Sequence, residues 1–282
     1  MKKLGYLGPQ GTFCEQAAEI INKELKYELV PLDAIFECIR EVGRGHVDGA
    51  VVPIENSLEG SISVTLDELV FGNQDVEIVA EIALPIEHHL VVLPGTQTNQ
   101  ITDIFSHPQA LSQCRLFLEK NFPKAVTHQA SSTARSVHLI SRADNLGHSA
   151  AIASRQAAQI NKCEILLENV ADNTKNTTRF IYIAKGKGKQ GKSNKTTIIF
   201  TLDKDRPGGL HEVLGELAGR QINLTKIESR PDKMTMGGYI FFVDLQGFRE
   251  EPKMKEALAA VEKKAQSFKV LGSYPVVDIE RA

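Results

Sequence analysis

The chain has 282 residues, 42% of them hydrophobic, and its 33 basic and 35 acidic side chains leave a formal net charge of −2. This length favours two domains, because single cores stop growing at roughly 250–300 residues, and the composition excludes a disordered chain. No apolar run approaches the roughly 20 residues that a membrane-spanning helix needs. The chain begins without a charged, apolar and small-residue leader, so we expect a cytoplasmic protein that makes no membrane contact.

The cysteines and histidines are scattered along the chain. Cys14, Cys38, Cys114 and Cys163 form no C-x-x-C pair, so in a cytoplasmic chain we expect reduced thiols that pack as small apolar side chains. The segment Gly8–Gly11 lacks the glycine spacings of nucleotide-binding loops. We therefore predict no metal and no cofactor.

Charge is unevenly distributed. Residues 1–184 carry 15 basic and 22 acidic residues, a net charge of −7, whereas residues 185–195 carry five lysines, three glycines and no large apolar residue. Such a segment cannot order itself by burial, so we predict a flexible linker and a domain boundary near residue 190. Because the lysine run is short and lacks interleaved aromatic residues, we expect no nucleic-acid binding.

Strand and helix patterns alternate at the start of the chain. The expected elements are strand 3–8, helix 12–23, strand 27–30, helix 34–43 and strand 48–54. Such alternation favours parallel strands with helices on both faces, an α/β fold.

The later strand patterns predict a second lobe. The stretch 76–93, broken by Pro85, can hold a strand that leaves one lobe and a strand that enters the next. Further strands are expected at 101–105, 124–127 and 150–153, and those at 164–167 and 179–184 are expected to return. Lobe one would hold residues 1–78 and 164–184, and lobe two residues 79–163. Two crossings between lobes form a cleft, a favoured place for small ligands.

Three loop-to-helix junctions have capping patterns. Thr12 precedes a glutamate by three residues, Ser106 precedes a glutamine in the same way, and Ser132 and Thr133 open a third helical segment. Free N–H groups at a helix start hold carboxylates without net positive charge, which matters in a domain that repels anions at long range. Singly each is an ordinary cap, but three at the ends of successive strands favour an anion site.

Two polar stretches adjoin apolar strands. Glu55, Asn56 and Ser57 follow strand 49–52, where polar side chains of an α/β sheet usually face the cleft; the alternative is a turn in which Asn56 and Ser57 bond their own backbone. The polar run 173–178 has the composition of a solvated loop. From the residues alone, this region is a two-lobed binder of a small anion.

The residues after the linker predict a second fold. The expected elements are strand 196–202, helix 210–221, strands 222–229 and 239–245, helix 251–264 and strand 268–274. The order βαββαβ is that of a ferredoxin-like sandwich. Its sheet leaves a face and edges for another subunit, so we expect a homodimer or homotetramer.

Five motifs occur in the order expected of prephenate dehydratases. They are G-P-Q-G-T-F at 8–13, P-I-E-N-S at 53–57, S-H-P-Q-A-L-S-Q-C at 106–114, A-A-I-A-S-R-Q-A-A at 150–158 and T-R-F at 178–180. After the linker, E-S-R-P at 228–231 resembles the regulatory ACT domain of these enzymes. The chain thus resembles this family from about residue 4 to about residue 276, with the catalytic domain over 1–184 and the ACT domain over 196–276.

The resemblance implies a catalytic domain shaped like two-lobed type II periplasmic binding proteins. It implies conversion of prephenate to phenylpyruvate in phenylalanine synthesis, with loss of carbon dioxide and water. Thr178 matches the threonine regarded as essential in this family. The residues that match the expected pocket lining are Glu55, Asn56, Ser106, His107 and Gln113.

This reaction needs no cofactor, because formation of an aromatic ring drives it. The enzyme has to hold two carboxylates and assist departure of the C4 hydroxyl. We expect Thr178 to donate a hydrogen bond to the departing oxygen and Glu55 or a water to supply the proton. Arg179 or Arg155 is a candidate clamp for a carboxylate. The expected substrate-binding residues are Gly11, Thr12, Asn56, Ser57, Ser106, His107, Gln113, Ser132, Thr133, Arg155, Arg179 and Phe180.

The ACT resemblance implies that phenylalanine inhibits the enzyme. The expected effector-binding residues are Gly208, Gly209, Leu210, Asn223, Leu224, Glu228, Ser229 and Arg230. Gly209 replaces an alanine that is common in the family, and His211 follows Leu210 where an apolar residue is usual. These departures leave the identity of the effector open.

Two other functions fit the same sequence. An arogenate dehydratase would accept the amino acid in place of the keto acid, and a non-catalytic amino-acid sensor would use the cleft for binding alone. The T-R-F match argues against the sensor. The two resembling domains take up nearly all of the length, so we expect no fused mutase or dehydrogenase.

Overall fold

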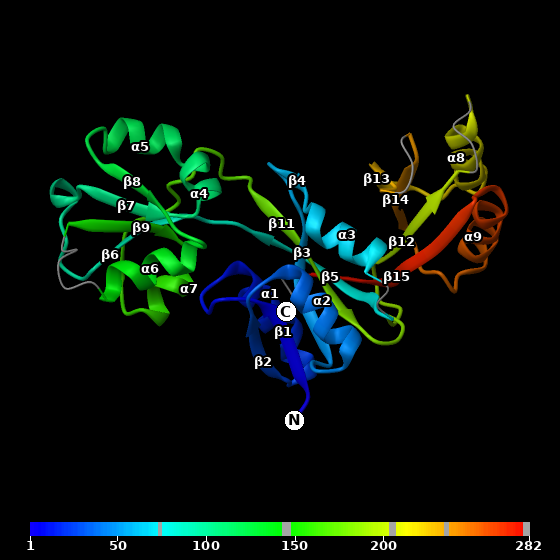
Figure 1. Ribbon diagram of the computed structural model, residues 1–282, viewed down its shortest axis with the longest axis horizontal. Helices are drawn as coiled ribbons and strands as arrows, with labels where there is room; N and C mark the ends of the chain where they lie inside the picture. Colours follow the sequence, from blue (N-terminus) through cyan, green and yellow to red (C-terminus); the bar gives the residue numbers. More distant parts are fainter. Residues whose placement is uncertain (73–74, 143–147, 203–206, 234–236, 279–282) are drawn as a thin grey trace.

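The computed structural model describes residues 1–72, 75–142, 148–202, 207–233 and 237–278. Figure 1 shows three bodies in a row: the second lobe (green), the first lobe in the middle, and the C-terminal domain (yellow to red). None of the described helices is long and apolar enough to span a membrane.

The first lobe is a mixed sheet with helices on both faces, which confirms the α/β prediction. Its elements are β1 (Lys3–Leu7), α1 (Phe13–Leu25), β2 (Glu28–Leu32), α2 (Ile35–Arg44), β3 (Gly49–Asn56), β4 (Gly60–Ser61), α3 (Ser63–Phe71), β5 (Glu77–Pro85) and β11 (Thr177–Ala184). The strand order is β5-β11-β3-β1-β2. Apolar residues of α1 form the core on one face, and those of α2 and α3 form the core on the other.

The second lobe has its own five-stranded sheet. Its elements are β6 (His89–Val92), the 3-10 helix η1 (Thr98–Gln100), β7 (Asp103–Ser106), α4 (Pro108–Gln113), α5 (Arg115–Asn121), β8 (Val126–Gln129), α6 (Thr133–Arg142), β9 (Ser149–Ala153), α7 (Arg155–Ile160) and β10 (Glu164–Leu167). The strand order is β10-β6-β9-β7-β8.

The lobe boundaries differ from the prediction at both crossings. β5 stays in the first lobe as far as Pro85, because its apolar side chains pack in that lobe's cores. β10 belongs to the second lobe, where it pairs antiparallel with β6. The two crossing segments bond to each other, since Ile86 N donates to Asn176 O at 2.9 Å. The two crossing segments run in opposite directions. The strands next to them therefore pair antiparallel, β5 with β11 and β6 with β10, whereas the alternation of strands and helices predicted parallel pairing.

The C-terminal domain has the predicted order βαββαβ. Its elements are β12 (Asn194–Thr201), α8 (Gly209–Gly219), β13 (Leu224–Pro231), β14 (Tyr239–Gln246), α9 (Pro252–Lys264) and β15 (Ser267–Val277). The strand order is β13-β14-β12-β15, and α8 and α9 pack on one face of the sheet. This arrangement confirms the ferredoxin-like fold.

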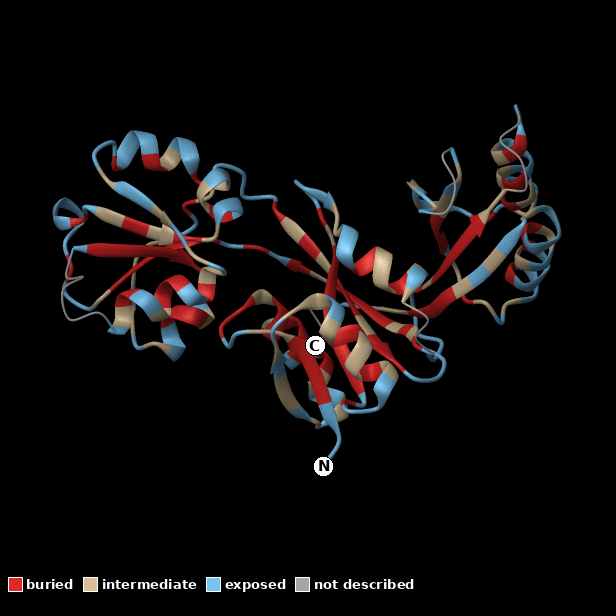
Figure 2. Cartoon of the chain, viewed as in Figure 1, coloured by how far each residue is buried: buried red, intermediate tan, exposed pale blue. Residues whose placement is uncertain are grey.

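The C-terminal domain is continuous with the first lobe. β15 pairs parallel with β5, so ten strands form one sheet. Ile199, Phe242 and Tyr274 lie on the helix-free face and pack with Cys38 and Ile39 of α2 in one core, and Figure 2 shows the buried strands (red) running through this junction. The face that we expected to be left for another subunit is thus covered within the chain.

The segment 185–195 also packs against this junction. A Cβ on Gly188 would lie 2.3 Å from the carbonyl oxygen of Ser273, and Gly191 N donates to Asn194 Oδ1 at 2.7 Å. The backbone therefore lies directly on β15, in contrast to the free linker predicted from composition.

The β5–β15 pairing predicts the effect of two glycine substitutions. In Gly272→Ala the new Cβ would lie 2.3 Å from the Ile78 carbonyl oxygen, so we expect the free energy of unfolding to fall by about 1–3 kcal/mol. In Gly215→Ala, on the exposed side of α8 with no heavy atom within 4 Å of the new Cβ, it should rise by about 0.5–1 kcal/mol. Urea unfolding of both variants measures the difference, and equal shifts would contradict a close contact at β5.

Candidate active site

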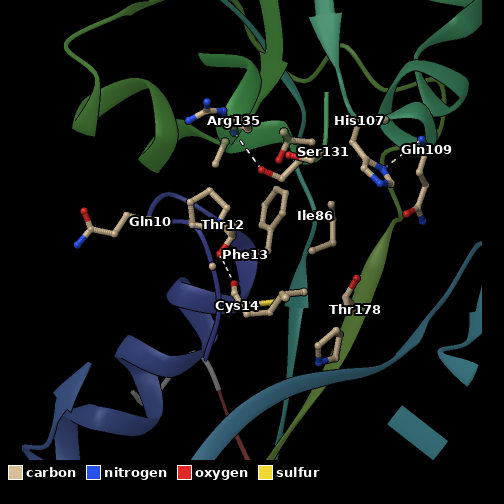
Figure 3. Close-up of a pocket in the computed structure, with 18 of the residues that line it drawn as sticks. Gln10, Thr12, Phe13, Cys14, Ile86, His107, Gln109, Ser131, Arg135 and Thr178 are labelled. Atoms are coloured by element: carbon tan, nitrogen blue, oxygen red, sulfur yellow. Dashed lines mark hydrogen bonds between the residues drawn. The ribbon is translucent and has the colours of Figure 1, made fainter. Parts of the chain in front are cut away.

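A cavity of about 860 Å³ lies between the two lobes, beside the crossings of the chain. The first lobe contributes the start of α1, the end of β3 and the start of β11, and the second lobe contributes the starts of α4 and α6 (Figure 3). A cavity of this size and position suits a small ligand.

Thr178 and Asn56 meet in this cavity. They are opposite each other in the antiparallel β3–β11 pair, and Asn56 Nδ2 donates to Thr178 Oγ1 at 2.9 Å. Asn56 Oδ1 accepts the N–H groups of Leu58 and Glu59 at 2.9 and 3.2 Å, so the backbone sets the orientation of the amide. Because Thr178 Oγ1 accepts from Asn56, its own proton is left to donate in another direction.

A polar network continues from Asn56 across both lobes. Asn56 Nδ2 also donates to Asn176 Oδ1 at 2.7 Å, and Asn176 Nδ2 donates to Gln113 Oε1 of α4 at 3.0 Å. His88 Nε2 lies 3.1 Å from the same Gln113 oxygen. Since that oxygen only accepts, His88 donates from Nε2, and its buried Nδ1 has no partner among the described residues. The network therefore connects Thr178, through Asn56 and Asn176, to Gln113 in the second lobe.

Burial favours the neutral form of two histidines that line the cavity. It lowers the pKa of His88 and of His107 below the ordinary value of 6.5. His107 is the N-cap of α4, and its Nδ1 accepts the N–H of Gln109 at 3.3 Å. These rings contribute hydrogen-bonding groups and no positive charge.

The start of α1 supplies backbone donors from the first lobe. Thr12 is the predicted N-cap, and its Oγ1 accepts the Glu15 N–H at 3.3 Å. Gly11 has a φ of 86°, and a Cβ there would lie 2.9 Å from the Ala157 Cα, so only glycine fits. The Gly11 N–H donates to Glu15 Oε2 at 2.6 Å and is not available to a ligand, contrary to the prediction. The remaining N–H groups of the first turn have no partner within the helix, and its residues Phe13 and Cys14 line the cavity.

The start of α6 faces the cavity from the second lobe. Ser132 Oγ accepts the N–H of Arg135 at 3.0 Å, and Ser132, Thr133 and Arg135 all line the cavity. Figure 3 shows Arg135 and Ser131 across the cavity from Thr178. Arg135 is exposed, so its guanidinium stands at the rim.

Glu55 and Arg179 lie outside the cavity, which corrects two predictions. Neighbouring residues of a strand point to opposite faces, so the residues beside Asn56 and Thr178 face the other way. On that face Arg179 donates to Glu55 at 2.5 Å. Burial alone would raise the pKa of the Glu55 carboxyl, but the hydrogen bond from Arg179 and the charge of Lys226 hold it below its ordinary value. An ionised carboxylate out of reach cannot supply the proton, and Arg179 cannot clamp a ligand.

Three further predicted residues also lie outside the cavity. Ser106 is fully buried at the end of β7 and donates to the Ile152 carbonyl at 2.6 Å, so the cap of α4 falls to His107. Arg155 pairs with Glu168 at 2.7 Å on the surface. Ser57 Oγ accepts the Thr177 N–H at 2.9 Å, a contact with the start of β11, so of the predicted local turn bonds only those of Asn56 Oδ1 to the next residues form.

Predicted residues that do line the cavity come from five elements. They are Thr12, Asn56, His107, Gln113, Ser132, Thr133, Thr178 and Phe180. Sequence reasoning missed His88, Asn176 and Arg135. Asn176 belongs to the polar run whose composition predicts a solvated loop. Its position two residues before Thr178 puts it on the same side of an extended chain, which is the signal that points to the cavity.

Comparison with known proteins identifies the family. The family model for prephenate dehydratase matches residues 4–188, and that for the ACT domain matches residues 196–263. The chain belongs to the prephenate dehydratase family.

Individual members of this family match nearly the whole chain. It is 39% identical to the prephenate dehydratase of Methanocaldococcus jannaschii, over 98% of this chain and 99% of the relative. It is 41% identical to a bifunctional chorismate mutase/prephenate dehydratase of Aquifex aeolicus, over 97% of this chain and 73% of the relative. The crystal structure of a prephenate dehydratase from Arthrobacter aurescens in complex with L-Phe has a TM-score of 0.88 and 34% identity, over 97% of this chain and 90% of that one.

The ACT domain of this family member places the predicted effector residues in two surroundings. Gly208, Gly209 and Leu210 form the start of α8, while Asn223 and Leu224 lead into β13, which carries Ser229 on its exposed side.

Two residues of the E-S-R-P motif contact the first lobe. Glu228 accepts a hydrogen bond from Ser61, and Arg230 pairs with Asp67 at 2.9 Å. The effector motif therefore borders the catalytic domain.

Proposed function

We propose that this protein is a prephenate dehydratase, a carbon–oxygen lyase that forms phenylpyruvate, carbon dioxide and water from prephenate in phenylalanine biosynthesis. Its family membership supports the reaction. One observation carries the proposal: the Thr178 hydroxyl, 8% exposed at the cavity, is held by the Asn56 amide with its proton free to donate.

Thr178 assists the step in which the ring becomes aromatic. The bond between the ring and its carboxylate breaks, its electron pair enters the ring, and the bond from C4 to the hydroxyl oxygen breaks. The Thr178 proton stabilises the departing oxygen through a hydrogen bond, and water supplies the proton that completes the water product, because an alcohol is too weak an acid to transfer its own at neutral pH. One such positioned donor is worth about 10²–10³ in kcat.

Neutral donors hold the two carboxylates of the substrate. The first turns of α1 and α6 present backbone N–H groups from opposite lobes, with the positive ends of the helix dipoles behind them. Arg135 at the rim adds one charge-assisted contact. Carboxylates held from both lobes keep the ring between them, beside Thr178.

Prephenate is favoured over arogenate by the charges of the lining. Arogenate carries an ammonium group where prephenate has a keto oxygen, and a buried ammonium needs a carboxylate partner. Among the described lining residues, Asp33 is the one carboxylic acid, and it is exposed.

Turnover of the two substrates tests this assignment. We expect kcat/KM for prephenate to exceed that for arogenate by at least about tenfold, equivalent to about 1.4 kcal/mol of transition-state binding. Phenylpyruvate and phenylalanine formation are measured separately. A preference for arogenate would assign the protein as an arogenate dehydratase, and no turnover of either would favour the sensor.

Substitution of Thr178 tests the mechanism. Thr178→Val removes the donor and keeps the branched shape, so kcat for prephenate should fall by about 10²–10³. Thr178→Ser keeps a hydroxyl and should retain most activity. Thr177→Val, at the neighbouring position outside the cavity lining, is the matched control and should leave kcat unchanged. Wild-type kcat in folded Thr178→Val would refute the role of the hydroxyl.

The remaining expectations concern the cell and the assembly. We propose a cytoplasmic enzyme, supported by four free cysteine thiols, which a reducing compartment preserves. We also propose a homodimer or homotetramer. Its support is the edge strand β13, which ends the ten-stranded sheet, and exposed apolar side chains at Ile227 and Tyr239.

Phenylalanine is the proposed feedback inhibitor. The ACT domain and the L-Phe complex of the Arthrobacter aurescens relative support this. Phenylalanine should lower the rate of prephenate turnover by binding the less active arrangement more tightly. L-Alanine, which lacks the ring, is the control ligand. Light scattering measures the association state. If millimolar phenylalanine changed neither the rate of turnover nor the association state, this proposal would be contradicted.

A further inference from the structure

The β3–β11 strand pair has a second face that carries charges. Asn56 and Thr178 face the cavity, while Glu55 and Arg179, opposite each other in the same register, form an ion pair on the far side of the sheet. Each charged residue adjoins a cavity residue in the chain. Contacts that fix the positions of Arg179 and Glu55 therefore also fix the backbone positions of Thr178 and Asn56.

The ACT domain holds Arg179 directly. Asp244 of β14, 1% exposed, accepts from Arg179 Nη2 at 2.7 Å. The other oxygen of Asp244 accepts the Thr197 hydroxyl at 2.7 Å, and that hydroxyl bonds the buried Tyr274 at 2.7 Å. Asp244 is thus fixed by Thr197 of β12, which in turn bonds Tyr274 of β15, and it presents a rigid carboxylate to a largely buried guanidinium.

A second ACT residue holds the partner strand. Lys226 Nζ of β13 lies 3.1 Å from Glu55 Oε1, and the Lys226 side chain is 9% exposed. Lys195 Nζ of β12 lies 2.6 Å from Glu81, the third carboxylate around Arg179. The first lobe supplies Arg179, Glu55 and Glu81 to this cluster, and the ACT domain adds Lys195, Lys226 and Asp244.

We propose that Asp244 and Lys226 of the ACT domain are positioning residues of the active site, which set the placement of Thr178 and Asn56 from the far side of the sheet. The inference rests on the proposed role of Thr178. Without Asp244, Arg179 keeps Glu55 and Glu81, and without Lys226, Glu55 keeps Arg179, but each loss removes one partner from a buried charge. We expect the strands to move to compensate for that lost partner. A displacement of about 1 Å at a reacting group costs about 10²-fold in rate.

Kinetics of two charge-removing variants test this role. Asp244→Asn keeps the side-chain shape, and kcat for prephenate should fall at least about tenfold with KM within about threefold, because other elements hold the carboxylates. Lys226→Met, in a less buried site, should act in the same direction and serves if Asp244→Asn does not fold. Thr196→Val is the control: it removes buried ACT hydrogen bonds to Gly247 and Ser273 that lie outside the cluster. Wild-type kcat in both folded variants would overturn the proposal.

A double variant separates positioning from general destabilisation. In the Thr178→Val background the hydroxyl to be positioned is gone, so adding Asp244→Asn should lower kcat by less than about twofold. Losses that multiply would mean that Asp244 acts by a route that does not pass through Thr178, and would reject the inference.

Hydrogen–deuterium exchange provides a readout that needs no turnover. Asp244→Asn should speed exchange in residues 49–56 and 177–184 and leave the second-lobe strands β7 and β9 at the wild-type rate, whereas Thr196→Val should change none of these. A wild-type protein inactive on prephenate would refute the proposed function. Unchanged exchange in β3 and β11 would refute the positioning role, whatever the substrate.

Discussion

The register of β11 against β3 is the constraint on which the site depends. Because side chains alternate along a strand, the register that sets Asn56 opposite Thr178 on one face sets Glu55 opposite Arg179 on the other. A slip of one residue would bring a guanidinium into the cavity and a threonine among the charges. The neutral reactive pair and the interdomain ion pair are therefore two consequences of one backbone arrangement.

The lining of the cavity contains no buried charged side chain among the described residues, although the proposed ligand is an anion. Amides, hydroxyls, imidazoles and the starts of two helices face the space, and the lining residues Asp33 and Arg135 are exposed. Dipoles fixed by caps and by the backbone need no reorganisation when negative charge arrives. The buried ions of this region lie behind the sheet, where carboxylates surround Arg179. Burial alone would lower the pKa of that guanidinium, but the charges of Asp244 and Glu81 raise it well above its ordinary value.

The ACT domain and the strands that carry Asn56 and Thr178 belong to one continuous sheet in this chain. The ACT domain extends the first-lobe sheet through β15, shares a core with α2, and contributes charged partners to the strands that carry Asn56 and Thr178. A domain joined through a continuous sheet and a buried ion cluster has few ways to move without moving those strands. This gives a regulatory module a short physical route to the cavity, from Glu228 beside Lys226 to Glu55 and then along the backbone to Asn56.

The sequence by itself determined the α/β and βαββαβ folds and the cap at Thr12, because periodicity and capping patterns are local properties. The position of Thr178 at the site followed only from the resemblance of its motif to a family, since composition predicts a solvated loop there. Tertiary structure alone decided that Glu55 and Arg179 face the ACT domain and that β10 belongs to the second lobe. It also decided that His107, and not Ser106, is the N-cap of α4. It also recruited His88, Asn176 and Arg135 to the cavity. Which face of a strand meets a cavity, and which partner a buried charge finds, depend on the packing of segments far apart in the chain, and local patterns carry no record of that packing.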